Sequence, residues 1–99
     1  MKTIALKTVV APINGVETRI GYGSQISELM RTPADSKGAD LDEIRHSIRI
    51  LDAVEAAKGD VLELEDADFE FMKNKILKTR WPLIDRWVQQ FIEDVTNPK

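Results

Sequence analysis

The dipeptide Asn14-Gly15 lies between two segments in which β-branched and polar residues alternate. Asn-Gly is the strongest two-residue signal for a β-hairpin, because both residues readily adopt the positive φ angles of a type I′ turn. We therefore predict a hairpin over residues 3–22. Pro12 has no amide proton for a strand ladder, so its end of the hairpin should lie at a sheet edge. The residues expected to share one face are Ile4, Leu6, Thr8 and Val10 before the turn, and Val16, Thr18, Ile20 and Tyr22 after it.

Helical patterns follow the hairpin. Ser24 is a candidate N-cap for a short helix over 25–31, and a loop rich in turn formers spans 32–39. Asp40 and Glu43 have capping-box spacing, which predicts a helix from about Leu41 to Lys58. Its apolar residues recur at helical spacing, so we expect them to face the core. They are Leu41, Ile44, Ile48, Leu51 and Val54.

The second half of the chain predicts two more helices. Residues 61–65 form either a short strand or an extended lead into a helix over 66–79. Pro82 suits the first turn of a last helix, from Leu83 to about Val95. The expected buried side chains are Phe69, Met72, Ile76 and Leu77 in the first helix, and Ile84, Trp87, Val88, Phe91 and Val95 in the second. The predicted fold is a single α+β domain, residues 1–99, in which an N-terminal hairpin packs against three to four helices.

Composition narrows the function classes. The 99 residues carry a formal net charge of −3 and include no cysteine. An acidic chain argues against a dedicated nucleic-acid domain, which is usually basic. The lack of thiols excludes disulfides, zinc-thiolate sites and a cysteine nucleophile. We find no apolar run of membrane-spanning length and no signal-peptide pattern, so the expected location is the cytoplasm, or the host cytoplasm if a phage encodes the chain, with no membrane partner.

The stretch from Lys73 to Trp81 reads KNKILKTRW and is locally basic. Acidic residues precede it, so the positive charges fall at the end of a helix, where the macrodipole favours them. A phosphate-binding surface is the alternative interpretation, since lysine and arginine neutralise nucleic-acid backbones. The candidate phosphate contacts are Lys73, Lys75, Lys78 and Arg80.

Trp81 lies at a predicted joint between helices, beside Arg80. Exposed tryptophan and arginine are typical of interface hot spots, but a buried staple between two helices would also suit Trp81. The candidate interface residues are Tyr22, Arg80, Trp81 and Arg86, whereas Trp87 lies on the inward stripe of the last helix.

The sequence contains no recognisable enzyme motif. His46 is the sole histidine, so we predict no metal site and no bound cofactor. A relay among Asp42, His46 and Ser47 fails, because neighbouring residues on a helix point apart.

The layout of the chain resembles small proteins encoded by tailed bacteriophages and prophages. The residues that carry the resemblance are Asn14-Gly15, Thr32–Asp35, Ile50–Ala57, Leu62–Phe69 and Arg80-Trp81. The resemblance implies a non-enzymatic protein that serves virion or tail assembly, or that binds a host protein, such as an enzyme or a defence factor, to inhibit or redirect it.

We therefore expect a protein–protein interaction module with a phage or host protein as partner, acting through an exposed hairpin edge or the Trp81 joint. Self-association into a homo-oligomer is also expected, since an early hairpin needs its apolar face covered. The first alternative is a small regulator that contacts DNA through the basic residues from Lys73 to Arg86. The second is an enzyme or small-ligand binder, which requires a pocket that the sequence does not signal.

Overall fold

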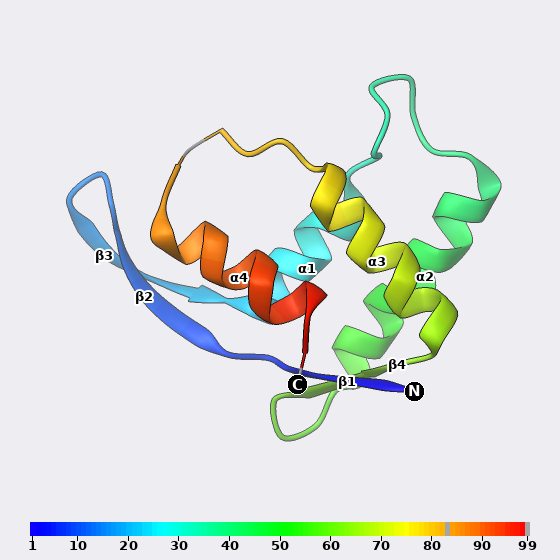
Figure 1. Cartoon of the computed structure of the whole chain (residues 1–99), viewed down its shortest axis with the longest axis horizontal. Coiled ribbons are helices and arrows are strands. Elements are labelled where there is room, and N and C mark those ends of the chain that lie inside the picture. The colour runs from blue at the N-terminus through cyan, green and yellow to red at the C-terminus, as the bar shows by residue number, and fades with distance from the viewer. Residues whose placement is uncertain (83, 99) are drawn as a thin grey trace.

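The hairpin predicted around Asn14-Gly15 is present in the computed structural model, which describes residues 1–82 and 84–98 (Figure 1). Strand β2 (Thr8–Ile13) pairs antiparallel with β3 (Val16–Gly21), and Ile13 opposes Val16 across the turn. Asn14 and Gly15 have φ angles of 52° and 79°. These positive values are those that a two-residue turn of type I′ requires.

The residues before the hairpin form a separate strand, which the sequence pattern did not distinguish. Strand β1 (Lys2–Ala5) pairs antiparallel with β4 (Val61–Leu64), and β4 is the short third strand that was predicted as one of two alternatives. The amide of Leu6 donates to the carbonyl of Asp60 at 2.7 Å, whereas the amide of Tyr22 donates to the carbonyl of Lys7 at 2.8 Å. The backbone N–H and C=O groups of neighbouring residues in a strand point to opposite edges of that strand. Strands β4 and β3 therefore pair with opposite edges of one bent segment made of β1 and β2.

The bend at Leu6 and Lys7 also changes which residues face inward. Ile4 is buried, but Thr8 and Val10 are exposed, and Ala11 is buried in their place. The expectation that Thr8 and Val10 share one face with Ile4 is therefore wrong. A continuous period of two assumes a straight strand, and the bend between the two pairings breaks that period.

Helix α1 (Tyr22–Arg31) follows β3 directly, with Gly21 as its N-cap. The prediction that Ser24 caps this helix is wrong, because the helix already begins two residues earlier. Helix α2 (Leu41–Ala56) begins as predicted, and the Asp40 side chain accepts a hydrogen bond from the Glu43 amide at 2.8 Å. It ends at Ala56 rather than near Lys58.

Helix α3 (Asp66–Lys78) agrees with the predicted range, and α4 (Arg86–Thr96) begins later than predicted. Asp85 caps α4 by accepting from the Trp87 amide at 3.2 Å, so Pro82 lies before the helix and not in its first turn. Leu83, the predicted first residue, lies outside the described residues.

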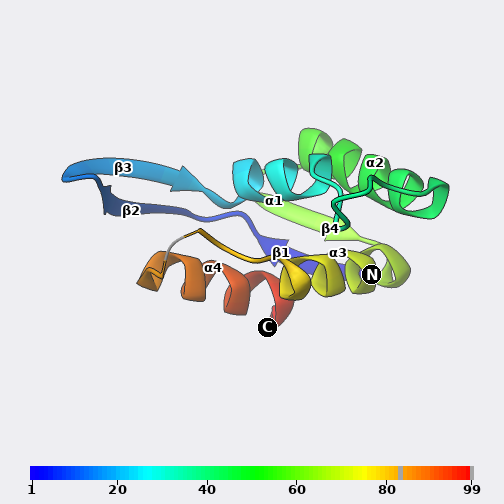
Figure 2. The ribbon, with the colours of Figure 1, turned by 90° about the horizontal axis from the view of Figure 1, so that it is seen from above.

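The strands lie between two pairs of helices. Figure 2 shows α1 and α2 along one side of the strands, and α3 and α4 along the other. The main core cluster draws side chains from β1, β4 and all four helices, including Tyr22, Ile50, Met72 and Phe91. A second cluster joins the hairpin to α4 through Ala11, Ile20, Trp87 and Val88. The hairpin is thus stabilised mainly by α4, which covers its inner face.

The apolar stripe predicted on α2 is only partly in the core: Leu51 and Val54 are half-buried and pack against the main core, but the first three members of the stripe do not. Leu41, Ile44 and Ile48 are 59%, 43% and 51% exposed, whereas Ser47 and Ile50 are buried. Leu77 of α3 and Ile84 before α4 were also expected in the core and are exposed. Apolar residues lie on two arcs of this helix, and both arcs show the same helical spacing. The spacing alone therefore does not show which arc packs against the rest of the chain.

Candidate protein-interaction surface

Helix α4 forms the wall on which the candidate site is built. Its buried side chains are Trp87, Val88, Phe91 and Val95, and their spacing places them on one face of the helix, as predicted. Trp87 and Val88 pack against the hairpin, and Phe91 reaches the main core. The buried face of α4 is therefore held by the hairpin and the core. Its outer flank lies beside the linker between α3 and α4.

Trp81 connects this linker to the core. It is half-buried, and its ring meets Trp87 and Phe91 edge to face, with centroids 6.1 Å and 6.0 Å away. Such T-shaped aromatic pairs are favourable beyond the apolar area that they bury. Within the described residues, the indole N–H groups of Trp81 and Trp87 have no hydrogen-bond acceptor. Trp81 therefore combines the two interpretations drawn from the sequence, because it staples the linker to α4 and also borders the surface described next.

An apolar hollow of about 680 Å³ lies between the linker and the outer flank of α4. Its apolar lining comes from Trp81, Ile84, Val88 and Ile92. Ile84 is fully exposed, at 106% of its reference area. The remaining lining residues are polar or charged: Asp85, Arg86, Gln89 and Glu93. An apolar centre with a charged rim is the usual anatomy of a protein–protein interface.

The hairpin offers a second, smaller surface. Both strands of the two-stranded sheet are edges, and the pairing register leaves the backbone groups of Thr8, Val10 and Pro12 directed away from β3. Val10 and, at the tip, Val16 are exposed. Pro12 lies at the edge, as predicted. Because Pro12 has no amide proton, the outer edge of β2 provides only a short run of donors for an added strand.

The four predicted interface residues lie in three different places. Trp81 and Arg86 line the hollow. Arg80 is exposed and borders a different hollow of about 220 Å³, at the end of α3. Tyr22 is completely buried, so its assignment to an interface is wrong.

Tyr22 instead has a structural role. Its hydroxyl donates a hydrogen bond to Asp94 Oδ2 at 2.8 Å, and its ring meets Phe91 edge to face. Burial, together with the hydrogen bond to Asp94 and its negative charge, raises the pKa of Tyr22 well above its ordinary value. The first residue of α1 therefore anchors α4 to the core.

The residues predicted as phosphate contacts in the basic stretch differ in how exposed they are. Lys75 is buried, and its ammonium lies 3.0 Å from Glu43 Oε2, 3.3 Å from Ser47 Oγ and 3.2 Å from the Met30 carbonyl. The ammonium thus makes two hydrogen bonds and an ion pair inside the protein, so the assignment of Lys75 as a phosphate contact is wrong. The other members of the stretch remain candidates: Lys73 is half-buried, while Lys78 and Arg80 are exposed.

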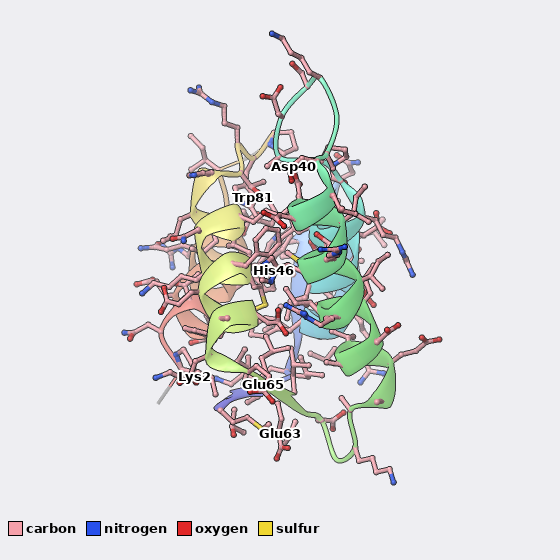
Figure 3. All side chains as sticks on the ribbon, turned by 90° about the vertical axis from the view of Figure 1, so that its right-hand side faces the viewer. Lys2, Asp40, His46, Glu63, Glu65 and Trp81 are labelled. Atoms are coloured by element: carbon pink, nitrogen blue, oxygen red, sulfur yellow. The ribbon has the colours of Figure 1, made fainter. Side chains whose placement is uncertain are left out.

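Lys75 belongs to a polar and aromatic seam between α2 and α3 that the sequence did not reveal. Along this seam Glu43 pairs with Lys75, His46 stacks on Phe71 with centroids 4.9 Å apart, and Arg49 pairs with Asp68. In these three contacts the residue numbers rise along α2 while they fall along α3, so the two helices run antiparallel. Figure 3 shows His46 pointing into the space between them.

Asp68 is the centre of the lower part of this seam. It accepts from Arg49 Nη2 at 2.8 Å and lies 2.8 Å from His46 Nδ1. Burial alone would raise the pKa of Asp68, but the hydrogen bonds and charges of Arg49 and His46 outweigh burial and hold it below its usual range. None of the hollows described above is lined by His46 or Asp68. The geometry accounts for this cluster as a joint between two helices.

The described part of the chain offers neither a cluster of metal ligands nor a membrane-spanning helix. Among residues 1–82 and 84–98, no three histidine, cysteine or acidic side chains come together in a group that could hold a metal ion. In the same part of the chain, no helix has both the length and the apolar character needed to cross a membrane.

Sequence reasoning missed the partners of Lys75 and Asp68 because these contacts join residues that are far apart in the chain. It found Trp81 and Arg86 from their residue types, but it placed Ile84 in the core when Ile84 is the most exposed member of the hollow.

Comparisons with protein-family models, with curated proteins and with solved structures found no match for this chain.

Proposed function

We propose that this chain is a non-enzymatic protein–protein interaction module that binds its partner through the apolar hollow beside α4. The observation that carries the proposal is the fully exposed Ile84 at an apolar hollow bordered by Trp81. A large aliphatic side chain held in water is unfavourable by roughly 1.5–3 kcal/mol relative to full burial, so covering it provides a driving force for binding.

The openness of this surface favours a protein over a small molecule. Small-ligand sites usually enclose most of the ligand surface. Here Ile84 projects into solvent and encloses nothing. The charged residues around the hollow, Asp85, Arg86 and Glu93, include both signs and suit a polar rim that fixes the orientation of a partner.

The hollow is also a better candidate than the hairpin edge. Strand addition draws its affinity from main-chain hydrogen bonds, and Pro12 shortens the row of donors on β2. The proposed partner is a protein that presents an apolar side chain or helix face. The resemblance to small phage proteins supports a partner from the virion or from the host, and with it a role in assembly or in host-protein binding.

The test is a selection of peptides from a displayed random library against the immobilised chain, followed by affinity measurements with variants. We expect the selected peptides to lose at least about tenfold in affinity for Ile84→Glu, because a charge would occupy the apolar centre of the hollow. Leu77→Glu is the matched control, since Leu77 is an exposed leucine on α3 that does not line the hollow. It should bind the peptides like the unmodified chain.

Peptides that bind Ile84→Glu as tightly as the unmodified chain would contradict the proposal. A parallel titration with a labelled DNA duplex covers the other function class. Binding that weakens steeply as salt rises, and that Lys78→Glu abolishes, would favour the DNA-contacting alternative.

A further inference from the structure

Helix α2 carries an apolar stripe that is mostly exposed, and the packing of this chain uses only its last member, Leu51. Leu41, Ile44, Ile48 and Leu51 are separated by steps of three, four and three residues. This is the spacing of the a and d positions along the seam of a coiled coil. Leu41, Ile44 and Ile48 are exposed, and Leu51 at the end of the stripe is half-buried and also touches the main core. The arc containing Ser47 and Ile50 packs against the rest of the molecule. We name these four residues the α2 stripe.

We propose that the α2 stripe binds the same stripe of a second copy of this chain, with the two helices antiparallel about a two-fold axis. When this axis passes midway between Ile44 and Ile48, Ile44 faces the partner's Ile48 and Leu41 faces the partner's Leu51. All four apolar side chains then find an apolar neighbour. A two-fold contact of this kind is self-complementary, since each pairing occurs twice.

Charge complementarity supports a second copy as the occupant. Arg45 follows Ile44 and Asp52 follows Leu51, so both lie at the e position, on the same flank of the stripe. In an antiparallel pair this flank faces itself, and Arg45 of each copy approaches the partner's Asp52. Within the described residues, neither side chain takes part in an ion pair of its own chain.

A parallel pair would not bring these two charges together. In a parallel pair, residues at e face residues at g of the partner. The g positions within α2 are occupied by Ser47, which is buried against Lys75, and by Val54, which lies over Gly23 of α1, and neither residue is charged. A parallel partner would therefore offer Arg45 and Asp52 no oppositely charged residue of α2, whereas the antiparallel arrangement pairs Arg45 with the partner's Asp52.

The interface is short but needs no folding step. The stripe covers about 15 Å of helix, at 1.5 Å per residue. Isolated helices of this length are unstable in water, but α2 is already ordered by its contacts with α1 and α3. Figure 1 shows α2 toward one end of the long axis, and the start of α4 toward the other. Self-association through α2 thus leaves the α4 hollow open, and either proposal can fail without the other.

The first experiment measures association by sedimentation equilibrium from about 1 μM to 1 mM, the range in which weak complexes dissociate. We expect a monomer–dimer equilibrium for the unmodified chain and for Leu77→Glu, and a monomer throughout for Ile48→Glu. Far-ultraviolet circular dichroism should show the same helix content in all three, because Ile48 and Leu77 are exposed. A monomer at every concentration, or a dimer that Ile48→Glu leaves intact, would overturn the proposal.

A charge-swap series tests the pairing itself. Arg45→Asp and Asp52→Arg should each weaken the dimer by roughly tenfold, because two attractive pairs become two repulsive ones. An equimolar mixture of these two variants should regain the affinity of the unmodified chain, since only the mixed dimer restores opposite charges at both contacts. A mixture as weak as its components would show that Arg45 and Asp52 do not meet.

Cysteine cross-linking determines the orientation, and the chain has no cysteine of its own. Ile44→Cys and Ile48→Cys should form few disulfide-linked dimers alone, but should cross-link to each other when mixed and oxidised. Efficient cross-linking of each variant with itself would indicate parallel helices and would overturn the antiparallel geometry.

Discussion

Lys75 is the most informative single position, because its charge is buried and fully partnered. The side chain is 5% exposed, and that of its partner Glu43 is 14% exposed. Replacing Lys75 with methionine keeps much of the volume but removes the charge, which leaves a mostly buried carboxylate without its counter-ion. Breaking a buried ion pair in this way typically costs 3–5 kcal/mol.

We expect Lys75→Met to lower the free energy of unfolding by about 3 kcal/mol, the lower end of that range, because Glu43 keeps some contact with water and still accepts from the Ala34 amide at 2.9 Å. A chain of this size has roughly 5–15 kcal/mol of stability in total. The corresponding fall in melting temperature is about 12–24 °C, at 4–8 °C for each kcal/mol.

The assay is urea unfolding of a double-mutant cycle. Glu43→Gln removes the other charge and retains an acceptor for the Ala34 amide. The variant carrying both Lys75→Met and Glu43→Gln should lie within about 1–2 kcal/mol of the unmodified chain, because no unpaired charge remains. Lys78→Met is the control, since Lys78 is exposed on the same helix, and it should change stability by less than about 0.5 kcal/mol. A loss below about 1 kcal/mol for Lys75→Met, or additive losses in the double variant, would refute a buried Glu43–Lys75 pair.

Three further expectations concern stability. Asp68→Asn should cost about 1–2 kcal/mol at neutral pH, because it weakens the contacts to Arg49 and His46, and urea unfolding should show this cost disappearing in acid. The sign follows from the lowered pKa of Asp68: its contribution is present above the ordinary carboxyl pKa of about 3.9 and is lost as pH falls through the lower folded value, so a constant cost from pH 6 to pH 2 would contradict it. Trp81→Ala should lower the free energy of unfolding by about 2 kcal/mol through lost ring contacts, so an unchanged melting temperature would show that Trp81 does not staple the linker. Gly15→Ala should cost about 1 kcal/mol in the same assay, because φ is +79° there, and a neutral result would argue against the turn geometry.

The local elements were predictable from the sequence because their signals are local. The Asn14-Gly15 turn, the Asp40 cap and the ranges of α2 and α3 depend on residues within a few positions of one another. The start of α1 was not predictable in the same way. The residues Gly21 and Tyr22 continue the alternating pattern of a strand, but Tyr22 begins α1 and its side chain is buried in the core.

The side of α2 that faces the core could not be predicted, for a different reason. Its contact with α3 is made by Glu43, His46 and Arg49, which a hydropathy pattern assigns to solvent. Their partners are on another helix, and only the tertiary structure shows that the charges are paired. The same reasoning explains why Lys75 resembled a surface residue, and why Leu41, Ile44 and Ile48 of α2 remained exposed.

The bent strand made by β1 and β2 has a consequence for the order in which the chain folds. Ile13 and Val16 meet across two residues, whereas Ala5 must find Val61, which is 56 positions away. A short hairpin closes in about 1–10 μs, but a long loop loses more entropy on closure. The two pairings use opposite edges of the same backbone, so the hairpin can form while the other edge is still empty. The Leu6 amide, which donates to Asp60 at the bend, should then gain its protection from hydrogen exchange only after the hairpin has formed.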